Sequence, residues 1–244
     1  MSQTPGAGLL GLAALLLGLS ACTRPQPGAE FNDPYEAQNR AVHAENVQLD
    51  SLVFGREHPR KRPILPAPIA RSLSNAGDNL GMPSAVVNNL LQGKPGPALQ
   101  DTLRFAINTT IGIGGLFDPA SAMGIEAVDA DFGQTLHVWG APEGAFLVLP
   151  VAGPTTERDL AGSVVDVFLD PFNALGKPER YYLIAGRIGG AVGFRSANSE
   201  LIDSILYESA DSYAQMRLIY LQYRHNKLGI EEEVFDPYAD PYGQ

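Results

Sequence analysis

The chain has 244 residues, 45% of them hydrophobic, so it is long enough to bury one large core or two small ones. Lys and Arg total 17 against 27 Asp and Glu, and the resulting net charge of -10 argues against a nucleic-acid partner. The 26 glycines and 19 prolines predict short elements separated by many turns.

The N-terminus carries an uncharged, Leu-rich run from Gly6 to Ala21, which ends directly before Cys22. Small residues before a lone cysteine are typical of the site that a lipoprotein signal peptidase cleaves. We therefore interpret residues 1–21 as a signal peptide and Cys22 as an acylated mature N-terminus, the alternative being a free buried cysteine. Each buried methylene of an acyl chain contributes about 0.8 kcal/mol, so more than one chain on Cys22 gives a stable membrane anchor. Thr23 stands where Asp would signal inner-membrane retention, which by resemblance to lipoprotein sorting favours the outer membrane.

Three further features concern the ends of the chain. Cys22 is the only cysteine, which excludes an intrachain disulfide and a multi-thiolate metal site. Residues 1–8 contain no Lys or Arg, which is atypical of a signal peptide and consistent with a start codon upstream. We expect residues 22–32 to form a Pro-rich tether, residues 33–228 to form the folded domain, and residues 229–244 to form an acidic flexible tail.

Periodicity and capping residues predict a series of helices separated by turns. Asp33 and Pro34 favour a helix start, and Gly81 and Gly93 favour helix ends. The expected helices cover residues 35–54, 67–80, 84–92, 131–140, 155–169, 179–188 and, as the longest pattern, 198–228. Residues 145–151 form a short apolar run that is compatible with a strand or a buried turn.

The most unusual stretch begins at Asp101 as an amphipathic pattern and passes into a glycine-rich run. Residues 105–117 carry no charge, yet thirteen residues are too few to cross about 30 Å of hydrocarbon as a helix. The polar side chains Asn108, Thr109 and Thr110 precede three glycines that permit close backbone approach or positive φ, namely Gly112, Gly114 and Gly115. Taken alone, this stretch is most simply a buried core helix with a glycine-rich exit.

Local charge offers two further candidate sites. Arg60, Lys61 and Arg62 lie in a Pro-rich segment that is either a solvated loop or a surface that contacts lipid head groups. Glu126, Asp129 and Asp131 have no basic residue nearby in sequence, so we interpret them as a solvated acidic loop and not as an acid/base pair.

Motifs for catalysis and metal binding are missing from the sequence. There is no Gly-x-Ser-x-Gly elbow and no His-Glu-x-x-His, and the four histidines are scattered singly. The glycine-rich run departs from a dinucleotide-binding fingerprint at Phe117, where the third glycine would stand. We therefore expect no catalytic residue, no metal and no cofactor.

Five segments, in order along the chain, resemble the VacJ/MlaA family of lipoproteins. They are Asp33-Pro34-Tyr35-Glu36 with Asn39-Arg40; Asn88 to Gly93; Asp101 to Asp118; Asp131 to Thr135 with Trp139-Gly140, followed by Leu147 to Pro150, Gly153-Pro154, Arg158-Asp159, Gly162 and Asp166; and Asp211, Tyr213, Arg217, Tyr220 to Gln222 and Arg224. Together these segments extend over almost all of the chain after the tether.

The resemblance implies an all-α, ring-like single domain that is seated in the inner leaflet of the outer membrane. It further implies a central amphipathic channel through which phospholipids misplaced in the outer leaflet pass to a soluble periplasmic lipid carrier. A trimeric porin beside the ring is the implied neighbour, and no bond chemistry is implied.

Together with the residue patterns, this resemblance leads to the hypothesis that residues 101–118 contribute to the channel wall and that their glycines permit close packing. The alternatives are a scaffold lipoprotein that does not move lipid and a phospholipid hydrolase. The chain also departs from the family at four positions. Aromatic residues are usual at Gln38 and Glu45, an apolar residue at His43, and Pro at Ser212. We therefore expect the first helix to pack less deeply or to contact a different partner.

Overall fold

The computed structural model describes residues 31–54 and 65–230, and these residues form a mostly helical body. In chain order the elements are α2 (Glu36–Phe54), α3 (Ala67–Leu91), α4 (Pro95–Thr110), α5 (Pro119–Ala122), α6 (Phe132–Val138), β1 (Phe146–Leu149), β2 (Gly153–Thr156), α7 (Glu157–Leu169), the 3₁₀ helix η1 (Pro171–Ala174), α8 (Glu179–Ala197), α9 (Ser199–Asp203), the π-helical turn η2 (Ser204–Glu208) and α10 (Ser212–Leu228). The expected signal peptide with Cys22, most of the tether, Arg60, Lys61, Arg62 and most of the tail lie outside the described residues.

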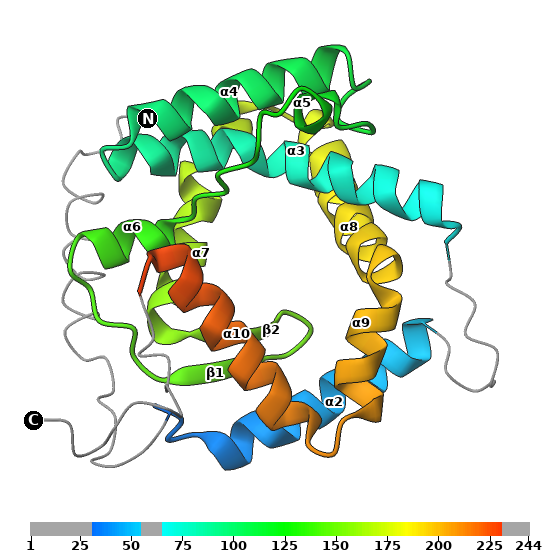
Figure 1. Cartoon of the computed structure of the whole chain (residues 1–244), viewed down its shortest axis with the longest axis vertical. Helices are drawn as coiled ribbons and strands as arrows, with labels where there is room; N and C mark the ends of the chain where they lie inside the picture. Colours follow the sequence, from blue (N-terminus) through cyan, green and yellow to red (C-terminus); the bar gives the residue numbers. More distant parts are fainter. Residues whose placement is uncertain (1–30, 55–64, 231–244) are drawn as a thin grey trace, which may run out of the picture.

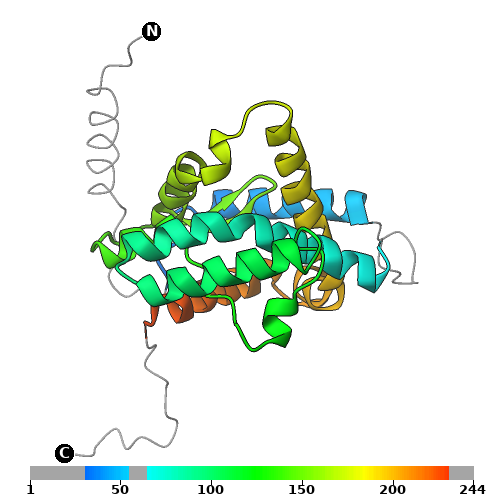
Figure 2. The same cartoon turned by 90° about the horizontal axis from the view of Figure 1, so that it is seen from above.

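The elements follow one another around a central region that is free of backbone in Figure 1, which confirms the ring-like helical fold. The helices α3 and α4 lie along one side of this ring, and α2 lies on the opposite side. Figure 2 shows that the segment joining α7 to α8 projects from one side of the ring body and the segment around α5 from the other. None of the helices in the described ranges is both long enough and apolar enough to span a bilayer.

Helix α3 runs without interruption where the sequence predicts two helices, 67–80 and 84–92, so that prediction is wrong. Gly81 and Pro83 lie inside the helix, at a local cost of about 1 and 3 kcal/mol respectively. Close packing along α8 outweighs this cost, because the two backbones touch: a Cβ added to Gly77 would lie 2.7 Å from the Cα of Gly190. Helix α8 is also longer than its predicted range of 179–188, since this contact with α3 continues past Gly190 to Gly193.

The single helix predicted for residues 198–228 is also wrong, because the chain leaves helical geometry at Ser209 (ψ 150°). Asp211 is extended and accepts a hydrogen bond from the amide of Ala214 at 3.0 Å, so it caps α10. The same carboxylate forms an ion pair with Arg40 of α2 at 3.0 Å. The apolar periodicity continues across this break, which hides the break in the sequence.

The β1–β2 hairpin confirms the strand option for residues 145–151 and pairs antiparallel with Phe146 opposite Thr156. Two asparagines of α2 hold its outer edge. The side-chain amide of Asn39 donates to the carbonyl of Phe146 at 3.0 Å and accepts from the amide of Val148 at 2.9 Å, as a third strand would. At the hairpin turn, the side-chain amide of Asn46 likewise donates to the carbonyl of Leu149 and accepts from the amide of Val151.

Two of the departures from the family pattern meet in the fold. Nε2 of His43 lies 2.9 Å from Oγ of Ser212, and the His43 side chain is buried against the ring of Tyr213. Burial lowers the pKa of His43. The expected shallow packing of α2 is therefore wrong at His43, whereas Gln38 and Glu45 are exposed.

Candidate functional site: a polar interior in an apolar shell

Helix α4 buries its polar face and exposes its apolar one. Asp101, Arg104 and Asn108 are 1%, 4% and 3% exposed, whereas Leu99 and Leu103 are 62% and 47% exposed. The buried positions recur at the spacing of one helical face, so α4 is an amphipathic helix turned outside in. The expected core helix with a glycine-rich exit is present, but its buried face is polar.

The same reversal extends around the described part of the ring. The largest fully buried side chains include Arg158, Asn79, Asn88, Asn89 and Asp101 beside the apolar Phe146 and Leu136, and about half of the buried apolar residues are alanines. Large apolar side chains are exposed on nearly every helix; examples are Leu52, Val53, Ile69, Leu90, Ile111, Ile113, Phe117, Val167, Phe168, Tyr181, Tyr182, Ile188, Phe194, Leu201 and Tyr223. Large apolar side chains exposed in such number indicate contact with lipid or another protein.

A cavity of about 630 Å³ lies between α3, α4 and the segment that follows α4. This volume is in the range of small-molecule sites. The lining residues are Asn75, Gly77, Asp78, Gly81, Met82 and Ala85 of α3; Asp101, Arg104 and Asn108 of α4; and Asp118, Ser121, Glu126, Ala127 and Asp129. The polar face of α4 therefore faces a cavity, which Met82 and Ala85 make apolar at one wall.

Arg104 ties the segment around α5 to α4. Its guanidinium pairs with Asp118 at 3.0 Å, donates to Oγ of Ser121 at 3.0 Å, and also donates to the carbonyl of Ile125. Asn108 donates to the other carboxylate oxygen of Asp118 at 2.9 Å. Burial alone would raise the pKa of Asp118, but the hydrogen bonds from Ser121, Asn108 and Arg104 lower it to about 2. Asp118 is therefore an anion whose charge Arg104 neutralises.

The other cavity carboxylates are less well compensated. Burial raises the pKa of Asp101, although this carboxylate accepts from Asn89 at 2.8 Å and from the amide of Val128 at 3.1 Å. Burial, together with the negative charges of Asp129 and Asp118, also raises the pKa of Asp78. The cavity therefore disfavours further negative charge and favours a cation.

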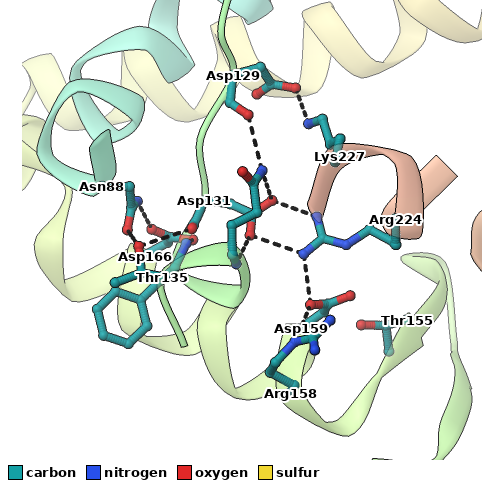
Figure 3. A network of polar contacts seen from close by, with 12 residues as sticks. Asn88, Asp129, Asp131, Thr135, Thr155, Arg158, Asp159, Asp166, Arg224 and Lys227 are labelled. Atoms are coloured by element: carbon teal, nitrogen blue, oxygen red, sulfur yellow. Dashed lines mark hydrogen bonds and ion pairs between the residues drawn. The ribbon is translucent and has the colours of Figure 1, made fainter. Parts of the chain in front are cut away.

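A second polar network joins α10 to α6 and α7 (Figure 3). Arg224 donates to both carboxylate oxygens of Asp131, at 2.6 and 3.1 Å, and to Asp159 at 2.7 Å. Lys227 pairs with Asp129. The interpretation of Asp131 as part of a solvated acidic loop is therefore wrong, because it pairs with Arg224, which follows 93 residues later on α10. Asp129 is solvated as expected, with 66% of its side chain exposed, although it pairs with Lys227. The side chain of Glu126 has no hydrogen bond or ion pair to any described residue, as expected for that position.

The network continues from α7 to α3. Asp166 accepts from the side-chain amide of Asn88 at 2.6 Å and from the backbone amide of Phe132 at 2.9 Å. Oγ1 of Thr135 donates to Oδ1 of Asn88 at 2.9 Å (Figure 3). Gly162 contacts the backbone of Gly133, where a Cβ would clash, so α6 and α7 approach each other closely here.

The six candidate residues of the glycine-rich stretch do not share one role. Asn108 lines the cavity, and Oγ1 of Thr109 accepts from Asn79 of α3 at 3.0 Å. Thr110 is exposed and bonds the carbonyl of Ala106 in its own helix at 2.6 Å.

The three glycines also differ from one another. A Cβ on Gly112 would clash with its own turn, and one on Gly115 would lie 2.5 Å from Asn79. Nothing lies within 4 Å of a Cβ on Gly114, so its positive φ of 69°, and not close packing, favours glycine there.

Comparisons with known proteins find relatives of this chain in sequence and in fold. The family model described as MlaA lipoprotein matches residues 31–227. The chain belongs to the MlaA lipoprotein family. It is 32% identical to a Haemophilus influenzae protein named "Intermembrane phospholipid transport system lipoprotein MlaA", over 86% of this chain and 87% of that one. The Escherichia coli K12 protein of the same name is 30% identical, over 94% of this chain and 90% of that one.

One further sequence match covers only part of the relative, and one solved structure matches the fold. An uncharacterised protein of Rickettsia prowazekii is 40% identical over 136 residues, and the aligned region spans about half the length of that relative (54%). A solved structure described as "Structural basis for maintenance of bacterial outer membrane lipid asymmetry" superposes with a TM-score of 0.66 at 28% identity, covering 80% of this chain and 98% of that chain. The network in Figure 3 is centred on Asp131, Asp159 and Arg224. The sequence resemblance included these three residues but gave them no role.

Proposed function

We propose that this protein is an outer-membrane lipoprotein that removes misplaced phospholipids from the outer leaflet and passes them to a soluble periplasmic carrier. In this proposal the ring lies in the periplasmic leaflet of the outer membrane, is anchored through Cys22 and stands beside a trimeric porin. The head groups travel through the polar interior, and Asn108 and Thr109 contribute to its wall. No covalent bond of the lipid is made or broken.

The observation that carries the proposal is the reversed burial of α4. A phospholipid has a charged head group and apolar chains, so a protein that moves it within a membrane needs a polar path inside a surface that acyl chains can surround. Asp101, Arg104 and Asn108 on one face with Leu99 and Leu103 on the other provide both surfaces on one helix. The names of the Haemophilus influenzae and Escherichia coli relatives support the same class of function.

Deletion of the gene in the native host tests the proposal. We expect phospholipid to accumulate in the outer leaflet, with no change in lysophospholipid, and we expect the wild-type gene to reverse the accumulation. A change in lysophospholipid would instead indicate a hydrolase. Unchanged outer-leaflet lipid with loss of an envelope complex would indicate a scaffold, and either result would contradict transport.

The lipid-facing surface can be tested separately with the purified protein. In a Cys22→Ser background, which removes the acyl anchor, Leu99→Glu with Leu103→Glu should weaken flotation with phospholipid vesicles. The matched control is Leu99→Met with Leu103→Met, which keeps the surface apolar and should float like the parent. Equal flotation of the two double variants would mean that this face of α4 does not contact lipid.

A further inference from the structure

The cavity beside α4 carries an unbalanced charge. Five carboxylates line it, from Asp78, Asp101, Asp118, Glu126 and Asp129, against the single guanidinium of Arg104. Arg104 compensates Asp118, and Lys227 compensates Asp129 from outside the lining. The carboxylates of Asp78 and Glu126 make no hydrogen bond or ion pair with any described residue.

The cavity also holds an unused donor. Arg104 is 4% exposed, and its Nε has no hydrogen-bond acceptor within residues 31–54 and 65–230. A buried donor without an acceptor is destabilising, so such a group is commonly completed by a ligand or by water. The lining therefore combines two carboxylates that have no partner among the described residues with a buried arginine whose Nε lacks an acceptor there.

This pattern is complementary to a zwitterion. We propose, on the basis of the proposed lipid transport, that the cavity is a head-group site that selects amine-bearing zwitterionic phospholipids over anionic ones. The ammonium group lies between Asp78 and Glu126, the phosphate accepts from Arg104, and the apolar wall at Met82 and Ala85 contacts the lipid beyond its head group. An anionic head group brings the phosphate without the ammonium and meets uncompensated carboxylates.

Two other properties of the lining concern its charge and its open space. Burial raises the pKa of Asp78, and the negative charges of Asp129 and Asp118 raise it further against the opposing charge of Arg104. Gly81 faces the cavity from the middle of α3, and a Cβ added there would meet nothing within 4 Å. Open space at this position gives a direct way to fill the cavity without disturbing the backbone.

The test measures which lipid the intact, acylated protein retains. Purified protein in detergent is mixed with equimolar dioleoyl phosphatidylethanolamine and dioleoyl phosphatidylglycerol, and the lipids that copurify with it are quantified by mass spectrometry. We expect phosphatidylethanolamine to be enriched on the wild-type protein. Asp78→Asn with Glu126→Gln should lower the ratio roughly three- to tenfold, the modest effect expected of two partly exposed ion pairs.

Matched variants separate the cavity from the overall charge. Glu45→Gln with Glu200→Gln removes the same charge from α2 and α9, which lie away from α3 and α4 in Figure 1, and should leave the ratio unchanged. Gly81→Leu should lower the total lipid bound, whereas Gly96→Leu, at a glycine of α4 that is outside the cavity and also has open space around it, should not.

The outcomes distinguish this inference from the proposed function. The wild type and the double variant Asp78→Asn with Glu126→Gln could retain phosphatidylethanolamine and phosphatidylglycerol in the same ratio. That result overturns the head-group site but leaves transport intact. No lipid retained by any version contradicts transport itself. Soluble glycerophosphoethanolamine should compete weakly, because it lacks acyl chains; competition as strong as that of the lipid would overturn the lipid assignment in favour of a soluble phosphoamine.

Discussion

Replacement of Arg224 should destabilise the ring more than any surface change. Arg224→Met removes the partner of two carboxylates, of which Asp159 has 8% of its side chain exposed and Asp131 has 33%. Breaking a buried ion pair on one side costs about 3–5 kcal/mol, because the other charge stays buried and unpaired. Asp159 retains Tyr220 as a hydrogen-bond donor at 2.8 Å and Arg158 at 3.5 Å, so we expect a cost near the lower end, about 3 kcal/mol.

The assay is thermal unfolding in detergent, where about 3 kcal/mol corresponds to a decrease of roughly 6–12 °C in Tm for a domain of this size. The double variant Arg224→Met with Asp159→Asn should recover much of the loss, since it removes the charge that is left buried. Arg224→Met with Asp131→Asn should recover less, because Asp131 is more exposed and also caps α6 through the amide of Gln134. A cost below about 1 kcal/mol, or no recovery with Asp159→Asn, would refute a stabilising role for this network.

Three further predictions concern other contacts. Gly190→Ala should lower Tm and separate α3 from α8, because the new Cβ would lie 2.6 Å from the Cα of Gly77. Gly189→Ala should leave Tm unchanged, because the nearest atom to its Cβ is 3.7 Å away. Equal Tm values for these two variants would contradict the close contact between α3 and α8. Asn39→Leu should increase amide hydrogen exchange in β1, since both strand-like bonds are lost, and unchanged exchange would show that the hairpin needs no third partner. The pKa of Asp118 is lowered to about 2 in the folded protein, so its contribution to the free energy of unfolding is present above about pH 4 and is lost as pH falls towards 2. Asp118→Asn should remove this part of the acid unfolding transition. An acid unfolding curve identical to that of the wild type would contradict this prediction.

Local sequence signals were sufficient for the elements whose stability is local. The helix predicted for residues 155–169 is observed at Glu157–Leu169, and Thr156 caps it by accepting a hydrogen bond from the amide of Asp159. Asp131 starts α6 in the same way. In both cases the residue that starts the helix acts within one turn of itself, so its effect can be read without the fold.

Signals that depend on distant partners failed. Gly81 and Pro83 are strong helix breakers, yet α3 continues because Gly190 and Gly193 of α8 let the two backbones touch. Likewise, Asp131 has no basic neighbour in sequence, and its partner Arg224 follows 93 residues later. The resemblance to the family included both residues, but only the structure shows that they form one contact.

The reversed burial explains why such distant contacts hold the ring together. Apolar side chains that face lipid or a partner provide little drive for helices to associate within the body, because acyl chains are as apolar as leucine. Close backbone packing and polar pairs therefore add to the apolar cluster of Phe146, Val148, Tyr213 and Leu221 in holding the body together, and they occur where segments far apart in the chain meet. Gly77 with Gly190 joins α3 to α8, Arg224 joins α10 to α6 and α7, and Arg217 joins α10 to Asp33 ahead of α2. Small and charged residues at these junctions therefore join the segments that close the ring, and one of them, Gly77, also lines the cavity.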